Sequence, residues 1–232
     1  MRIQRALARA GAASRRGAEA LVAAGRVTVN GAPAITGQPV DPDRDDIRVD
    51  GRRVGAPATP KWIVLNKPSG VMTTRRDPSG RKTVFDLVPD TAGLTYVGRL
   101  DLLTEGVLLL TTDGDGAHKL AHPSGEVPRT YIATVRGDGQ AAVERARGGV
   151  QLHDGLARVE NAKLRRAGRT LWEFEVTLTE GRNREVRRLC EALDLKVERL
   201  VRIAYGPVRL GSLQPGQWRE LQPGEVKRLL MA

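Results

Sequence analysis

The sequence is poor in aromatic residues, in cysteine and in long apolar runs, and each shortage excludes a class of protein. Three Trp, three Tyr and two Phe in 232 residues are too few for a protein that holds single strands mainly by base stacking. The single cysteine, Cys190, excludes a disulfide framework and a zinc site built on paired cysteines. No apolar run reaches the roughly 18 residues of a membrane-spanning helix. We therefore expect a cytoplasmic protein without a membrane partner.

Positive charge, by contrast, is abundant. The formal net charge is +11, and arginine outnumbers lysine by 31 to seven. Arginine binds phosphate through a planar fork of donors, although the composition of the source genome could produce the same bias. Because nucleic acids are the commonest polyanions that basic proteins bind, the charge indicates a nucleic-acid partner without naming it.

The first 55 residues have the pattern of a small helix–helix–sheet domain. Apolar periodicity predicts a helix over residues 3–10, and Ser14 can cap a second helix over residues 15–24. Asn30-Gly31 is typical of a tight turn between two short strands. The first 26 residues contain one acidic residue, Glu19, and six arginines: Arg2, Arg5, Arg9, Arg15, Arg16 and Arg26. These arginines are candidates for RNA binding, and the alternative is a charged face that only contacts solvent.

The remaining chain is dominated by short strands. Residues 56–60 have no periodicity and contain two prolines, which predicts a linker. Alternation of apolar and polar residues predicts strands, and a helix fits residues 183–193. Strands that outnumber scattered helices predict an α+β catalytic domain over residues 61–232, with a central mixed, largely antiparallel sheet. On the predicted helix Cys190 belongs to the apolar face, whereas Arg184, Arg187 and Arg188 lie off it and could bind RNA.

Three short motifs suggest cofactor or metal sites, but their context argues against each one. Residues 137–142, "GDGQAA", fit a dinucleotide-binding pattern, yet the preceding strand alternates, so we expect a turn. Residues 113–116, "DGDG", resemble a calcium loop but lack its later ligands. His118 and His122 have zinc-helix spacing without the catalytic glutamate or an evident third ligand, and we expect both on the surface. The sequence therefore predicts neither a metal nor a cofactor.

Five stretches together resemble one family. "LNKPSGVMTT", "VGRLDLLTEGVLLLTTDG", "PRTYIATVRG" and the arginine-rich "EGRNREVRRLCEALDLKVERLVRIAYGPVRLGSL" follow one another in the order found in pseudouridine synthases of the RsuA type. The N-terminal "RIQRALARAGAASRRGAEALVAAGRVTVNG" resembles an S4 RNA-binding domain of the αL type. Within the family, the spelling "GRNREVRR" is most similar to the RluB group of large-subunit rRNA enzymes. The resemblance covers nearly the whole chain.

The resemblance implies a role for individual residues. It makes Asp101 the nucleophile, Arg187 the arginine that pairs with it and Tyr131 the residue that lies against the target base. It also implies a substrate pocket that contains Leu200, Arg99 and Lys67. The chain departs from the family pattern at Asp101-Leu102-Leu103, where an aromatic or polar residue often replaces leucine, and this departure concerns the RNA contacts more than the chemistry.

The chemistry that this family carries out fits a lone aspartate. Uridine becomes pseudouridine when the N1–C1′ bond breaks and C5 takes its place, so no atoms are gained or lost and no cofactor is needed. An aspartate with the ordinary pKa of about 3.9 is ionised at neutral pH and can attack without a separate base. Attack at C1′, addition to C6 and a glycal route all remain open. Glu105 could supply the second carboxylate of a glycoside hydrolase only if the segment were helical, and the apolar run that follows Gly106 indicates a strand.

We therefore expect a monomeric rRNA pseudouridine synthase that acts on one flipped-out uridine, in 23S rRNA by the spelling of its arginine-rich motif. Naked rRNA and a ribosomal precursor particle are both possible substrates. A 16S rRNA enzyme and a non-catalytic RNA-binding or ribosome-assembly factor that keeps the fold are the alternatives. Asp101, Arg187, Tyr131 and Lys67 together argue against a mere binding protein, which has no use for that set.

Overall fold

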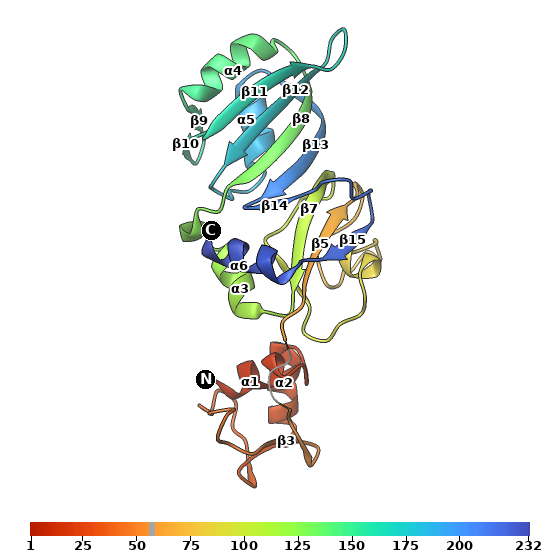
Figure 1. The fold of residues 1–232 in the computed structure, drawn as a ribbon, viewed down its shortest axis with the longest axis vertical. Coiled ribbons are helices and arrows are strands. Elements are labelled where there is room, and N and C mark those ends of the chain that lie inside the picture. Colours follow the sequence, from red (N-terminus) through yellow and green to blue (C-terminus); the bar gives the residue numbers. More distant parts are fainter. Residues whose placement is uncertain (56–58) are drawn as a thin grey trace. The chain divides into compact units, whose positions relative to one another are not determined.

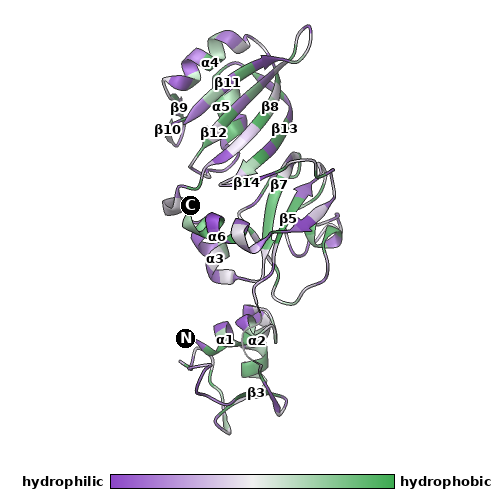
Figure 2. Ribbon diagram, in the orientation of Figure 1, coloured by the Kyte–Doolittle hydropathy of each residue, from purple (hydrophilic) through white to green (hydrophobic). Residues whose placement is uncertain are grey.

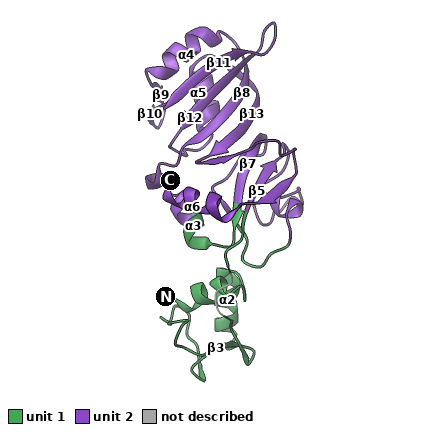
Figure 3. Cartoon of the chain, viewed as in Figure 1, with its two compact units in different colours: residues 1–62, 90–95, 110–117 green, residues 63–89, 96–109, 118–232 purple. Residues whose placement is uncertain are grey.

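The structure is a computed structural model that describes residues 1–55 and 59–232. The chain divides into two compact units, residues 1–62, 90–95 and 110–117 in the first and residues 63–89, 96–109 and 118–232 in the second (Figure 3). The predicted linker over residues 56–60 falls mostly on residues 56–58, which lie outside the described residues.

The N-terminal segment folds as two helices and a small sheet, as predicted (Figure 1). Ser14 caps the second helix, since its hydroxyl accepts a hydrogen bond from the backbone N–H of Gly17 at 3.1 Å. Asn30 and Gly31 have φ angles of +52° and +84°, the left-handed pair that a tight hairpin turn requires. The four short strands pair in the order β2-β1-β3-β4. The elements are α1 (Ile3–Arg9), α2 (Arg15–Ala23), β1 (Val27–Val29), β2 (Ala32–Pro33), β3 (Ile47–Val49) and β4 (Arg52–Arg53).

Strands predominate in the rest of the chain, with helices between them. The strands are β5 (Trp62–Lys67), β6 (Thr95–Val97), β7 (Thr104–Thr111), β8 (Arg129–Arg136), β9 (Val150–Leu152), β10 (Gly155–Ala157), β11 (Asn161–Arg166), β12 (Trp172–Leu178), β13 (Lys196–Tyr205), β14 (Val208–Arg209) and β15 (Trp218–Glu220). The helices are α3 (Gly114–Ala121), α4 (Gly139–Arg147), α5 (Glu185–Ala192) and α6 (Pro223–Met231), with short 3-10 turns η1 (Val84–Leu87) and η2 (Pro123–Gly125).

One sheet organises this part of the chain. In the described residues it has nine strands, in the order β11-β12-β8-β13-β7-β5-β15, with β14 beside β13 and β6 beside β7. Strands β13 and β7 are parallel, with Leu200 opposite Thr104, whereas β13 pairs antiparallel with β8. The pairs β11-β12, β12-β8, β13-β14 and β15-β5 are also antiparallel. The predicted α+β class and mixed, largely antiparallel sheet are confirmed.

The apolar strands that the sequence predicts are buried in the core. The run Val107–Leu110 in β7 is fully buried, and β5 is buried along its length. In Figure 2, β7 has the green colour of hydrophobic residues. Helix α5 packs its apolar residues, including Leu189 and Cys190, against the face of the sheet that carries Leu200. Burial raises the pKa of Cys190 to about 12. This thiol is therefore an inert part of the core, as predicted.

Two of the rejected motifs have clear structural roles. Residues 139–142 form the first turn of α4, where Asp138 accepts a hydrogen bond from the N–H of Ala141. The prediction of a turn for all of "GDGQAA" is therefore wrong, because it overlooked this capping aspartate. Asp113 of "DGDG" accepts hydrogen bonds from the N–H groups of Asp115 and Gly116 at the start of α3.

The remaining predictions concern the two histidines, metal ligands and membrane-spanning helices. His118 and His122 are exposed, as expected. Across residues 1–55 and 59–232, no group of three or more acidic, histidine or cysteine side chains is arranged to hold a metal ion. No helix in the same residues is long and apolar enough to span a membrane.

Candidate active site

Asp101 lies in the short loop between β6 and β7, half-buried and three residues before β7 begins. Hydrogen bonds hold the backbone of this loop. The Asp101 carbonyl accepts from the N–H of Thr104 at 3.1 Å, and the carbonyl of Leu100 accepts from the hydroxyl of Thr73 at 2.8 Å. Because the loop begins and ends in ordered structure, the carboxylate is presented from a fixed backbone.

Lys67 fixes the other side of the loop. Its side chain is fully buried at the end of β5, and its ammonium donates to the carbonyls of Pro68, Leu102 and Thr104 at 3.0, 3.1 and 2.9 Å. The N–H of Gly70 donates to the same Leu102 carbonyl at 2.9 Å. All protons of the ammonium therefore point to backbone oxygens, and the predicted place of Lys67 in the substrate pocket stays a prediction. The Lys-Pro-x-Gly motif holds the Asp101 loop.

Arg187 reaches the loop from α5. Its Nη2 donates to the carbonyl of Leu103 at 3.3 Å, and its Nε has no hydrogen-bond partner in the described structure. No ion pair within 4.0 Å joins it to Asp101 among the described residues, so the expected pairing acts through charge rather than direct contact. Burial lowers the pKa of Arg187, the charge of Arg184 lowers it further, and Asp101 raises it.

Charge also links Asp101 to the buried lysine. Burial lowers the pKa of Lys67 to about 8, while the carboxylates of Glu105 and Asp101 raise it. Two cations therefore flank the loop, one beneath it at the end of β5 and one on α5. The negative charge of Asp101 acts on both of them through space.

Leu200 comes from β13, which pairs with β7, and Tyr131 comes from β8, on the other side of β13. Tyr131 is half-buried on β8, and its hydroxyl lies 3.5 Å from Nη1 of Arg202, which is directly opposite in register. Leu200 lies two residues before Arg202 on β13 and is 3% exposed. Residues two apart share a face of a strand, so Leu200, Arg202 and Tyr131 lie on one face of the sheet. The predicted Leu200 is thus a core residue of this face, whereas Arg99 is exposed beside the Asp101 loop.

Glu105 belongs to the opposite face. Its carboxylate accepts two hydrogen bonds from Arg199, at 3.0 and 2.7 Å. Arg199 immediately precedes Leu200 on β13, and adjacent residues of a strand point to opposite faces. The second carboxylate that a glycoside hydrolase needs is therefore turned away from the face of Tyr131 and held by an arginine. The strand predicted after Gly106 is confirmed, and it begins at Thr104, so it includes Glu105.

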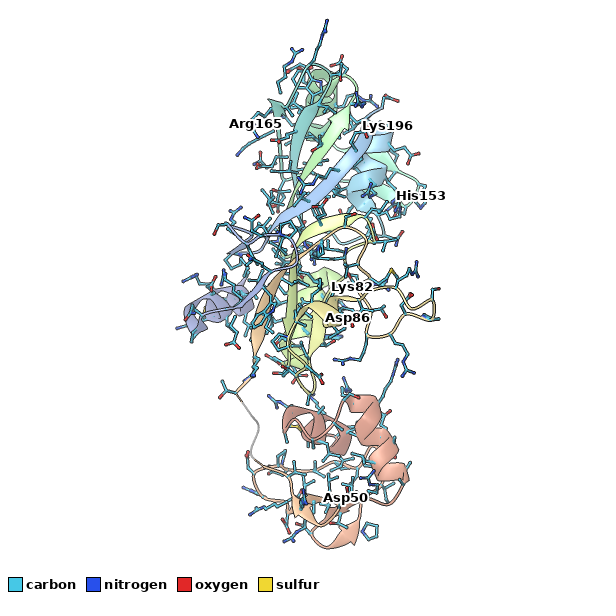
Figure 4. The ribbon with its side chains drawn as sticks, turned by 90° about the vertical axis from the view of Figure 1, so that its right-hand side faces the viewer. Asp50, Lys82, Asp86, His153, Arg165 and Lys196 are labelled. Atoms are coloured by element: carbon cyan, nitrogen blue, oxygen red, sulfur yellow. The ribbon has the colours of Figure 1, made fainter. Side chains whose placement is uncertain are left out.

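The predicted RNA-binding arginines divide into free and engaged side chains. Arg184, the residue before α5, is exposed, but Arg188 on α5 pairs with Asp154 at 2.8 Å. Arg188 also lies 2.9 Å from Nδ1 of His153, the residue labelled in Figure 4. Arg188, which the sequence predicts to bind RNA, is therefore already paired within the protein. A hollow of about 450 Å³ opens beside Arg184 and Arg187 and reaches Lys196 on β13.

The same division holds in the N-terminal segment. Arg26 forms a two-pronged pair with Asp50, at 2.8 and 2.6 Å, and Arg2 donates to the Gly37 carbonyl. Three arginines of the two helices are exposed: Arg9, Arg15 and Arg16. Arg5 is half-buried on α1.

Sequence reasoning missed two residues that shape the site. Thr73 holds the loop through the Leu100 carbonyl, and nothing local in "MTT" distinguishes it. Arg202 is 2% exposed and donates to the Val107 carbonyl at 2.7 Å. Its signal in the sequence was a lone charge in the otherwise apolar stretch "LVRIAY".

Comparison with known proteins identifies the family. The family model described as RNA pseudouridylate synthase matches residues 61–192, and the S4 domain model matches residues 1–47. An uncharacterized RNA pseudouridine synthase of Aquifex aeolicus is 43% identical over 236 residues, which cover 100% of this chain and 94% of the relative. Ribosomal large subunit pseudouridine synthase B of Vibrio cholerae is 44% identical over 238 residues, covering 98% of this chain and 74% of the relative.

A solved structure agrees with these matches. The crystal structure of a pseudouridylate synthase superimposes with a TM-score of 0.67 at 25% identity and covers 99% of both chains. The resemblance drawn from the motifs is therefore confirmed. The chain belongs to the RNA pseudouridine synthase family, isomerases that act on RNA, and it carries an N-terminal S4 domain.

Proposed function

We propose that this enzyme converts one specific uridine of large-subunit rRNA to pseudouridine, with Asp101 as the nucleophile. The observation that carries the proposal is the Asp101 loop, whose carbonyls from Leu100 to Thr104 all accept hydrogen bonds. A reacting group gains most when its position is fixed before the substrate arrives. Asp101 is the only carboxylate of the loop itself, residues 98–103.

The surroundings of Asp101 suit attack by a carboxylate. Arg187 and Lys67 supply positive charge near Asp101, and a carboxylate nucleophile needs no separate base to activate it. As the N1–C1′ bond of uridine breaks, the base carries negative charge, which these cations stabilise. The base then turns and C5 bonds to C1′, the bond between Asp101 and the nucleotide breaks, C5 loses its proton and N1 takes one up, so the atom balance of an isomerisation is kept.

Tyr131 supports the flipped base. A uridine must leave its stack to meet Asp101, at a cost of a few kcal/mol. A tyrosine ring that stacks on the base returns about 1–3 kcal/mol. Arg202 steadies Tyr131, because it lies opposite on β13 with its guanidinium carbon 6.0 Å from the tyrosine ring centre.

The rRNA target and the division of labour rest on two further observations. The relative of Vibrio cholerae is named for the large ribosomal subunit, and the exposed arginines of α1 and α2 form a basic surface on the S4 segment. In the proposal residues 1–55 hold structured rRNA and residues 61–232 carry out the isomerisation. Arg184 and Arg99, both exposed, would contact phosphates near the target.

The test compares pseudouridine maps of rRNA from the source organism with and without this gene, and then after addition of wild-type or Asp101→Asn protein. We expect one 23S rRNA pseudouridine to disappear on deletion and to return only with wild type. Asn caps a turn nearly as well as Asp, so a turn-capping role predicts full activity for Asp101→Asn. Loss of a 16S pseudouridine instead would refute the large-subunit assignment, and pseudouridine from folded Asp101→Asn protein would refute the nucleophile.

A further inference from the structure

Leu103 is unusual among the residues around Asp101 because it is apolar and faces solvent. Its relative exposure is 60%, whereas Leu100 before Asp101 and Thr104 after Leu103 are 6% and 2% exposed. A single exposed leucine is ordinary on a protein surface. Its position, two residues beyond the carboxylate, is not accounted for by packing, because the side chain contributes little to the core.

The backbone prevents Leu103 from turning inward. Its own carbonyl accepts from Arg187, and the carbonyls on either side, those of Leu102 and Thr104, accept from the buried ammonium of Lys67. Rotation of Leu103 toward the core would break hydrogen bonds to two cations, which are the stronger kind. The structure therefore holds an apolar side chain out in water at a fixed place.

We propose that Leu103 is a wedge that enters the RNA stack at the place left by the target uridine. The inference rests on the proposed function, in which that uridine is extruded to reach Asp101. Extrusion leaves the faces of the neighbouring bases uncovered, and apolar side chains inserted between base steps fill such gaps in other nucleic-acid complexes. The short distance along the chain between Leu103 and Asp101 places wedge and nucleophile on the same loop.

The polar groups nearby fit this assignment. Arg99 and Arg184 are exposed and suit phosphates, whereas Arg187 and Lys67 are committed to the loop backbone. No exposed aromatic residue lies within residues 98–106 to stack in the gap. Leucine offers no hydrogen bond to a base edge, so the wedge supports extrusion without reading the sequence.

The test uses two short RNA hairpins that carry the uridine identified by mapping, paired with adenosine in one and bulged in the other. Each hairpin has 2-aminopurine on the 3′ side of the uridine, whose fluorescence rises when its neighbour leaves the stack. The variants are Leu103→Ala, Leu103→Asn and Leu103→Met. The control is Leu156→Ala, which truncates a leucine that is 41% exposed on β10, outside the site. Single-turnover rates and fluorescence are measured at saturating protein.

On the paired hairpin we expect Leu103→Ala and Leu103→Asn to lower the rate about tenfold and to reduce the fluorescence rise, because the gap stays empty. Leu103→Met and Leu156→Ala should match wild type within twofold. On the bulged hairpin, where extrusion is already easy, all variants should approach the wild-type rate.

Three results separate the possible failures. Wild type that is inactive on rRNA refutes the proposed function itself. Active wild type with an equally fast Leu103→Ala on the paired hairpin refutes the wedge alone. An equal loss on both hairpins shows that Leu103 acts on the position of Asp101 rather than on extrusion, and this also overturns the proposal.

Discussion

The ammonium of Lys67 donates to the carbonyl oxygen of Thr104 at 2.9 Å, inside the protein and 37 residues away along the chain. This contact joins the end of β5 to the start of β7 directly behind the Asp101 loop. The lysine of the Lys-Pro-x-Gly motif thus has a structural role, which is to hold the backbone of the Asp101 loop.

We predict that activity falls as pH rises through about 8. Burial lowers the pKa of Lys67 to about 8, so the group is an ammonium below that pH and a neutral amine above it. An ammonium has three protons for its three carbonyls, whereas an amine has two. Initial rates from pH 7 to 9.5 at saturating RNA should therefore fall with one ionisation. A flat profile would contradict this account, and Lys67→Met should be nearly inactive throughout.

Arg187→Gln should lower turnover about a hundredfold, the usual cost of one well-placed charge at a reacting centre, with RNA affinity within a few-fold of wild type. Gln removes the charge near Asp101 and the donor to the Leu103 carbonyl. The matched control is Arg188→Gln on the same helix, because the partner of Arg188 is Asp154 rather than the Asp101 loop. Equal single-turnover rates for the two variants would remove Arg187 from the site.

Gly106→Ala should lower the free energy of unfolding of the catalytic domain by on the order of 3 kcal/mol. Gly106 has a φ of +101°, and a Cβ there would lie 2.1 Å from the carbonyl oxygen of Arg202 on the parallel strand β13. Gly211 also has a positive φ, of +60°, but has open space around it, so Gly211→Ala should cost only about 1–2 kcal/mol. Urea unfolding measures both, and equal losses would show that strain alone, without the collision, sets the cost.

The S4 surface should determine the salt dependence of RNA binding. If Arg9, Arg15 and Arg16 each meet a phosphate, replacing all three by Gln should flatten the log–log slope of affinity against salt by about 2 to 3 units. Arg26→Gln should change the slope little, because Arg26 is held by Asp50. An unchanged slope in the triple variant would place the main RNA contacts elsewhere.

Much of the fold could be predicted because its signals are local. The Ser14 cap, the Asn30-Gly31 turn and the apolar run Val107–Leu110 each depend on neighbouring residues, and each forms as predicted. The place of Asp101 just before a strand was likewise predictable from its motif. The turn predicted over residues 137–142 was wrong because Asp138 caps a helix that begins at Gly139, despite the glycines.

The sequence by itself determined which residue types are present and where the strands and helices form. Only the tertiary structure decided which cations are available for RNA. Lys67 donates to backbone carbonyls, Arg188 pairs with Asp154 and Arg26 pairs with Asp50. Arg184 stays exposed. Helical and strand periodicities depend on residues a few positions apart, but these partners come together through the pairing of β5, β7, β13 and β8 and the packing of α5. A charged side chain binds whichever opposite charge or carbonyl the assembled fold places beside it, and that placement is not written in its immediate neighbours.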